Sequence, residues 1–352
     1  MTSTMTLAKD NLFRRQPEEH FENFAAIRQN AAQQRARCRE IEARDLNVLF
    51  GESGDVYLGD HAVRPTHYSF SQLAAVARVP MAVLERLEVP TRASVLNQTF
   101  ERSRRMRIGL ADGDSLRAVT SDRYERLWDE EVLDAVDRWL LPSGFIPAMP
   151  TMSTDAAGSN ARGNSKPALF RSDRDSFCFF MSEETPRDAF GGLRKGLVVF
   201  NSEVGAKSLG FCTFLFRDMC ANFLIWGASG VVERTARHTS AVRELFGEFD
   251  QVLRSIANQV SPLEYAQVEK AARTEFVSGK DPVAVKSRLQ QEFGVPVKHL
   301  DDVLEATFLP ENVGEFTTWG LANGITSVAK SLPYAAEGVE LSRIAGQVLV
   351  AR

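Results

Sequence analysis

Residues 145–226 form a strand-rich stretch, and a long amphipathic helix is expected shortly after it. Within this stretch, the segment from Leu209 to Phe216 is apolar at both odd and even positions, whereas a strand with one face in water alternates. It is therefore predicted to be a central strand covered on both sides. Residues 239–259 place their apolar side chains in one helical stripe, which makes this helix the expected cover. The predicted strands are 145–151, 168–172, 176–182, 195–201, 208–217 and 221–226.

The flanking sequence predicts two further units. Residues 17–37 have the apolar spacing of an amphipathic helix, 46–58 and 106–124 read as hairpins, and 71–87 reads as two short helices. From residue 261 onward, helix-start signatures recur. We therefore predict an α+β fold in which an antiparallel, strand-rich middle domain is covered by a long helix. The expected parts are an N-terminal helix, hairpin and helical-hairpin region over 1–105, the core domain over 106–260, and a helical C-terminal unit over 261–352.

Composition restricts the class of protein. With 44% hydrophobic and 25% charged residues, the 352-residue chain can bury enough apolar surface to fold. Its net charge of -4 gives no global attraction to nucleic acid or anionic membranes. No apolar run is long enough for a membrane span or a signal peptide, so a cytoplasmic protein without a membrane partner is expected. The four cysteines and five histidines lack zinc-site spacing, so neither a metal nor a cofactor is predicted.

Positive charge is concentrated in two segments. Residues 92–107 contain five arginines and one acid, and residues 187–243 contain eight basic residues and four acids, which gives a net charge of +4 in each. These cations could form one basic face that neutralises phosphates, with Phe or Tyr side chains stacking on bases. The alternative is a solvated surface balanced by nearby acids. The predicted nucleic-acid contacts are Arg102, Arg104, Arg105, Arg107, Lys195, Lys207, Arg217, Arg234 and Arg237.

Polar clusters follow two of the predicted strands. Turn capping explains such residues without chemistry, but ligand contact and catalysis remain alternatives. A nucleophilic Cys/His pair would use Cys220 and His238, if the fold brings them together. The candidate polar site consists of Arg117, Ser121, Asp122, Arg123, Tyr124, Asn201, Ser202, Glu203, Gly205, Cys220, Asn222 and His238.

The ordered motifs Arg117-Ala118-Val119, Ser121 to Tyr124, Asn201 to Leu209 and Cys220-Ala221-Asn222 resemble an uncharacterised family of phage- and plasmid-like proteins, which is known only as a domain of unknown function. The resemblance covers the chain from about residue 40 and implies a mobile element without an established enzyme activity. It departs at Arg78, where glycine is expected before Val79-Pro80. The same segment loosely imitates a helix-turn-helix, and an ordinary helical hairpin is the alternative.

Three functions are compatible with these patterns. The first is binding or annealing of single- or double-stranded DNA by a homo-oligomer, since a strand meander capped by a long helix is similar in outline to the Red-beta- and Erf-like annealing proteins. The second is a module that binds a host or phage protein through the acidic C-terminal unit. The third, less favoured, is an enzyme centred on Ser121, Asp122, Glu203, Cys220 and His238.

Overall fold

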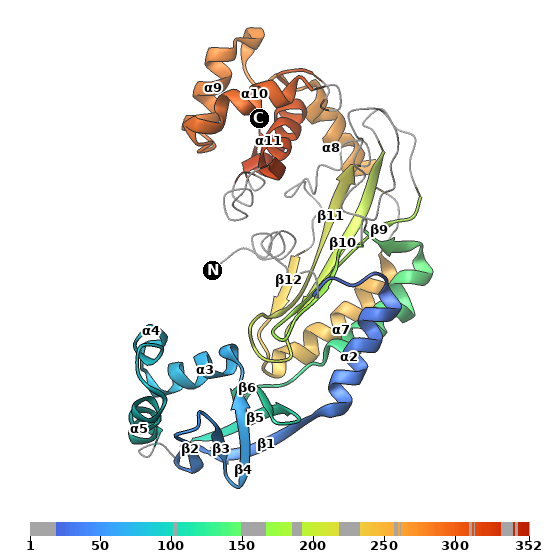
Figure 1. The fold of residues 1–352 in the computed structure, drawn as a ribbon. Helices are drawn as coiled ribbons and strands as arrows, with labels where there is room; N and C mark the ends of the chain where they lie inside the picture. Colours follow the sequence, from blue (N-terminus) through green and yellow to red (C-terminus); the bar gives the residue numbers. More distant parts are fainter. Residues whose placement is uncertain are drawn as a thin grey trace.

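The three parts of the chain follow one another along an arc, with the N-terminal sheet at one end and the C-terminal helices at the other (Figure 1). The computed structural model describes residues 19–100, 105–148, 167–184, 192–217, 233–256, 260, 262–309, 312, 314–331, 341 and 344–351. The predicted α+β class is confirmed, with an antiparallel middle sheet, a long helix against it and a helical C-terminal unit. Within the described ranges, no helix has the length and apolar character that a membrane crossing requires.

A six-stranded sheet and three helices make up the N-terminal lobe, residues 38–121. The sheet order is β1-β5-β6-β4-β3-β2, and both predicted hairpins, β2–β3 and β5–β6, lie in it. Because β5 and β6 pair with β1 and β4, the boundary expected at residue 105 falls inside this sheet. The strands are β1 (Cys38–Arg44), β2 (Val48–Phe50), β3 (Val56–Leu58), β4 (His61–Pro65), β5 (Met106–Asp112) and β6 (Ser115–Ser121).

The helices of this lobe are α3 (His67–Ala77), α4 (Met81–Leu84) and α5 (Val89–Phe100). The side chain of Thr66 accepts a hydrogen bond from the Ser69 backbone and so caps α3, while Pro80 immediately precedes α4. The helix α5 was not predicted. Its buried face packs with α3 and the sheet into one apolar core.

The middle sheet has the order β12-β11-β10-β9-β7, with β8 also paired to β9. The predicted central position of 208–217 is confirmed, because β11 lies between β10 and β12. Side chains on both faces of β9 and β10 are buried. The predicted strand 221–226 lies outside the described residues. The strands are β7 (Phe145–Pro147), β8 (Leu169–Arg171), β9 (Ser176–Ser182), β10 (Leu193–Asn201), β11 (Leu209–Arg217) and β12 (Glu233–Ala236).

Three helices cover one face of this sheet. These are α2 (Phe24–Arg37), α6 (Asp129–Ala135) and α7 (Ser240–Ser255), the helix predicted over 239–259. The ring of Phe249 in α7 lies 5.2 Å from that of Phe211 in β11. The apolar stripe that predicted this helix is therefore the surface that it buries against the sheet.

In the part of the C-terminal unit that the structure describes, the helices are α8 (Pro262–Arg273), α9 (Pro282–Gln291), α10 (Leu300–Thr307) and α11 (Thr318–Ser331), with a further helical segment over 344–349. Its core is apolar and includes the fully buried Trp319. Asp281 caps α9 by accepting from two backbone N–H groups, as its Asp-Pro signature predicts. The helices α10 and α11 approach so closely at Gly324 that a Cβ there would clash with Thr307.

Candidate functional site

A pocket of about 600 Å³ lies in the N-terminal lobe, at the C-terminal ends of α3 and α5 and the start of β5. Three of its lining residues are arginines, Arg78, Arg105 and Arg107, and one is acidic, Asp45. We call it the arginine pocket. Its formal charge is positive although the whole chain is anionic, and this excess makes it a candidate site for an anion.

Arg107 is held by Asp45. Its Nε lies 2.8 Å from Asp45 Oδ1 and its Nη2 lies 3.4 Å from Oδ2, and the carboxylate is only 1% exposed. The backbone N–H of Asp45 donates to the carbonyl of Arg105 over 2.9 Å. Two of the three guanidinium nitrogens of Arg107 are thus engaged, so the pair positions this side chain and neutralises one of the three positive charges.

Arg78 occupies the position where the sequence favours glycine. It follows α3 in the left-handed conformation, with φ 58° and ψ 32°, and its backbone N–H donates to the carbonyls of Ala74 and Ala75. Such a conformation disfavours a side chain by about 1–2 kcal/mol. The Arg78 side chain is exposed, and its guanidinium has no hydrogen bond or ion pair with any residue that the structure describes.

The other predicted nucleic-acid contacts lie on several elements. Lys195 in β10 has its Nζ 3.3 Å from Oε1 of Glu264 in α8, so this lysine links the sheet to the C-terminal unit. Arg234 and Arg237 are exposed in and after β12, and Lys207 is half-buried in the turn after β10. Arg102, Arg104 and the side chain of Arg217 lie outside the described residues. Of the predicted contacts that the structure describes, Arg105 and Arg107 line the arginine pocket, and Arg78, which was not in that set, joins them.

The candidate polar site is instead centred on buried ion pairs between the two sheets. Glu203, just after β10, has its Oε2 2.9 Å from Nη1 of Arg117 in β6 and 3.3 Å from Nη2 of Arg171 in β8. Arg171 Nε also lies 2.9 Å from Asp129 Oδ2 at the start of α6. Burial first, and then the nearby Asp129 carboxylate, raises the pKa of Glu203, while the two arginines oppose that rise.

Hydrogen bonds satisfy most of the remaining polar atoms of this cluster. Ser176 Oγ and Asn201 Nδ2 each donate to Asp129 Oδ1 over 2.9 Å, and the Asp129 backbone donates to Glu203 Oε1 over 3.1 Å. Asp129 is the first residue of α6 and does not cap that helix. Trp128 precedes the helix instead, and its backbone N–H donates to Glu131. Sequence reasoning missed Arg171, because nothing marks an arginine in a short strand as the partner of distant carboxylates.

Tyr124 and His238 form the edge of the cluster. The Tyr124 hydroxyl donates to the Ser202 carbonyl over 2.9 Å, and its ring stacks on His238 at 5.0 Å between centroids. His238 Nδ1 lies 3.2 Å from the Glu125 carbonyl, while the buried Nε2 has no partner among the described residues. Burial lowers the pKa of His238 to about 4 and raises that of Tyr124.

The structure thus brings together Arg117, Tyr124, Asn201, Ser202, Glu203 and His238, and it places Gly205 against the ring of Tyr124. Ser121 is the last residue of β6, and Asp122 and Arg123 are exposed in the turn that follows, whereas the side chains of Arg117 and Glu203 are 4% and 1% exposed. Cys220 and Asn222 lie outside the described residues. A carboxylate enclosed by two guanidinium groups is not placed to act on a substrate, and the geometry supports a joint between the sheets.

The chain matches no known family profile, no curated protein and no solved structure. The resemblance to phage- and plasmid-like proteins stays a prediction. Among the described residues, no three His, Cys, Asp or Glu side chains come together in a group that could hold a metal ion.

Proposed function

We propose that this chain is a cytoplasmic nucleic-acid-binding protein of a mobile element, and that it contacts the phosphates of a single strand at the arginine pocket. The observation that carries the proposal is that the Arg78 guanidinium has no partner among the described residues, while the Arg78 backbone holds a strained left-handed conformation beside Arg105 and Arg107. Strained residues are retained where the surrounding structure or the function requires them.

The charge of the arginine pocket supports this assignment. Its lining contains three guanidinium groups and one carboxylate, which is a formal excess of two positive charges. The C-terminal ends of α3 and α5 contribute about half a negative charge each, which reduces this excess without cancelling it. A site of this charge attracts a phosphate even though the whole protein is anionic.

Arginine geometry suits an anion with several oxygens, such as phosphate, better than a simple halide. A guanidinium presents several donors in one plane and can contact two phosphate oxygens at once. The Asp45 pair fixes the orientation of Arg107, so less side-chain entropy is lost when a phosphate binds. Arg78 lies directly after α3. A phosphate that binds its guanidinium has to displace no partner among the residues that the structure describes.

The test is oligonucleotide binding titrated over salt concentration. In the Arg78→Gln/Arg105→Gln double variant, we expect weaker binding and a salt slope reduced by about 0.7 for each lost single-strand phosphate contact. The matched control is Arg138→Gln, because Arg138 is exposed on the helix that follows α6, away from the pocket. An unchanged slope in the double variant would remove the pocket from the proposal.

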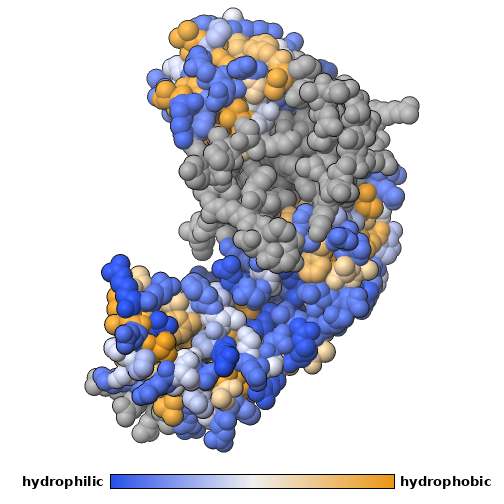
Figure 2. Space-filling view, viewed as in Figure 1, coloured by the Kyte–Doolittle hydropathy of each residue, from blue (hydrophilic) through white to orange (hydrophobic). Residues whose placement is uncertain are grey.

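A second candidate function is protein binding by the C-terminal unit, with a second copy of the chain as the partner. Four of its apolar side chains are largely exposed, Leu263, Val283, Val297 and Phe308, at 78%, 73%, 64% and 53%. Figure 2 shows hydrophobic patches over this unit, whereas the surface near α2 and β1 is mainly hydrophilic. Leu263→Asp/Val283→Asp should lower the mass measured by sedimentation, and an unchanged mass would exclude this role.

A further inference from the structure

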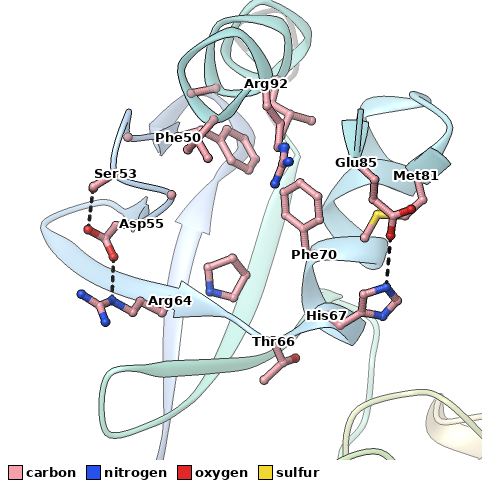
Figure 3. A pocket seen from close by; sticks show the side chains of 16 residues that line it. Phe50, Ser53, Asp55, Arg64, Thr66, His67, Phe70, Met81, Glu85 and Arg92 are labelled. Carbon is pink, nitrogen blue, oxygen red and sulfur yellow. Dashed lines mark hydrogen bonds and ion pairs between the residues drawn. The ribbon is translucent and has the colours of Figure 1, made fainter. Parts of the chain in front are cut away.

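A second pocket lies at the opposite ends of the same two helices. It has a volume of about 380 Å³ and is lined by residues of α3, α4 and α5, by the end of β2 and the turn after it, and by β4 (Figure 3). This size falls within the range of small-molecule sites. We call it the aromatic pocket, because the phenyl rings of Phe50 and Phe70 line it together with the aliphatic ring of Pro65.

The aromatic walls are fixed before any ligand binds. The backbone of Phe50 exchanges two hydrogen bonds with the side-chain amide of Asn97, at 2.7 and 3.0 Å. Its ring also packs edge-on against Phe100 at 5.3 Å. A preorganised ring loses little entropy when a planar ligand stacks on it.

Arg92 supplies a directed donor to the same space. Its Nε and Nη2 donate to the carbonyls of Leu84 and Leu87 over 2.9 and 3.1 Å, and its guanidinium lies 5.5 Å from the ring centroid of Phe70. Figure 3 shows this guanidinium extending into the pocket above Phe70. The remaining nitrogen, Nη1, has no hydrogen bond to any described residue. It is a donor with a fixed position next to an aromatic face.

The rim of the pocket is polar and its side chains contact one another in pairs. Arg64 Nε lies 3.2 Å from Asp55 Oδ1, and His67 Nε2 lies 3.4 Å from Glu85 Oε1. Apolar Met81 closes the wall beside Glu85. A ligand that fits this set is flat, stacks on phenyl rings, accepts a hydrogen bond from Arg92 and carries polar edges toward the rim.

We infer that the aromatic pocket takes one nucleobase of the strand whose phosphates bind at the arginine pocket, with the base stacked on Phe70 and a ring carbonyl accepting from Arg92 Nη1. The inference rests on the proposed function. Phe70 and Arg78 are eight residues apart in and just beyond α3, which corresponds to about 12 Å. This distance matches about three to four steps of a stacked strand at 3.4 Å each, so one short oligonucleotide can reach both pockets.

The test compares a strand of about eight nucleotides with the same strand lacking its bases, using the unaltered protein. We expect the strand with bases to bind about 5- to 100-fold more tightly, since stacking one base has this effect, with the same salt slope for both. Phe70→Leu keeps an apolar side chain but removes the ring. In this variant the difference in affinity between the two strands should shrink, and the salt slope should stay the same.

Each outcome separates the two proposals. If both strands bind equally in the unaltered protein with a clear salt slope, the base pocket is wrong and phosphate binding stands. If neither strand binds, the proposed function is wrong. The NMR resonance of the Met81 methyl group provides a second measurement, because Met81 lines the pocket and a bound nucleoside monophosphate should shift this resonance. A shift caused by N-acetyl-tryptophanamide alone would assign the pocket to a peptide side chain and overturn the inference.

Discussion

Nη1 of Arg117 lies 2.9 Å from Oε2 of Glu203, although the two residues belong to different sheets. Arg117 is in β6 of the N-terminal lobe, and Glu203 follows β10 of the middle sheet. Both side chains are enclosed, so neither can exchange its partner for water. This ion pair therefore fixes how the N-terminal lobe meets the middle sheet.

Removing one partner of this pair should strongly destabilise the protein. Arg117→Met leaves the Glu203 carboxylate buried with one guanidinium fewer, and the expected loss is about 3–5 kcal/mol of the free energy of unfolding. Arg117→Met/Glu203→Met removes both charges and should recover part of that loss. Urea unfolding of the two single variants and the double variant measures the coupling. Strictly additive losses would contradict a coupled pair.

Arg78→Gly should change stability and binding in opposite directions. Glycine adopts φ 58° without strain, but it costs more chain entropy than other residues, so the net gain is about 0.5–1 kcal/mol. The same change removes one of the three guanidinium groups of the arginine pocket, and oligonucleotide affinity should fall. Thermal unfolding and the salt-titrated binding assay check the two effects on one sample. Weaker binding together with lower stability would indicate disruption of the helix end instead.

Neutralising Asp45 should strengthen phosphate binding and lower the stability of the fold. In Asp45→Asn, Arg107 loses its charged partner at 2.8 Å, and the positive charge of the arginine pocket rises. We expect tighter oligonucleotide binding at low salt and a salt slope steeper by up to about 0.7, with a lower midpoint of urea unfolding. Asp112→Asn is the control, because Asp112 pairs with Arg37 at the far end of β5. An equal gain in the control would mean that only the net charge matters.

Local patterns predicted the elements that depend on neighbours in sequence. The stripe of α7, the β5–β6 hairpin and the Asp281 cap are each specified within about twenty residues, and the structure contains all three. The expectation of glycine at Arg78 also located a real left-handed position. These features need no knowledge of the rest of the fold.

Long-range pairing could not be predicted from such patterns. β1 pairs with β5 although three helices lie between these strands in the sequence, and β4 pairs with β6 in parallel. Asp45 lies 62 residues before Arg107, so the neutralisation of that cation was not visible in a count of nearby charges. The partners of Arg171 are distant for the same reason. Contacts between segments far apart in sequence decide which predicted cations remain available to a ligand.

The close approach of α10 and α11 gives a stability prediction with an internal control. In Gly324→Ala the new Cβ would meet Thr307 and, at 2.7 Å, the carbonyl oxygen of Val303, so we expect a loss of about 1–3 kcal/mol. Gly247 in α7 has no atom within 4 Å of the corresponding position. Gly247→Ala should therefore stabilise its helix by about 0.5–1 kcal/mol. Thermal unfolding of both variants shows whether the first loses and the second gains stability. If Gly324→Ala left the stability unchanged, α10 and α11 could move apart without cost, and the prediction would be wrong.

The buried imidazole of His238 should make the fold sensitive to acid. Its pKa is lowered to about 4, against about 6.5 in an unfolded chain, so between these values the unfolded state binds a proton that the folded state does not. The neutral imidazole therefore costs no stability above pH 6.5, and the free energy of unfolding falls as the pH drops from 6.5 toward 4. Between pH 7 and pH 5 the loss from this residue is about 2 kcal/mol. His238→Phe keeps a ring against Tyr124 and removes the titrating group, so its urea midpoint should fall less over the same interval. Equal falls in both proteins would show that other groups, such as carboxylates, cause the acid sensitivity.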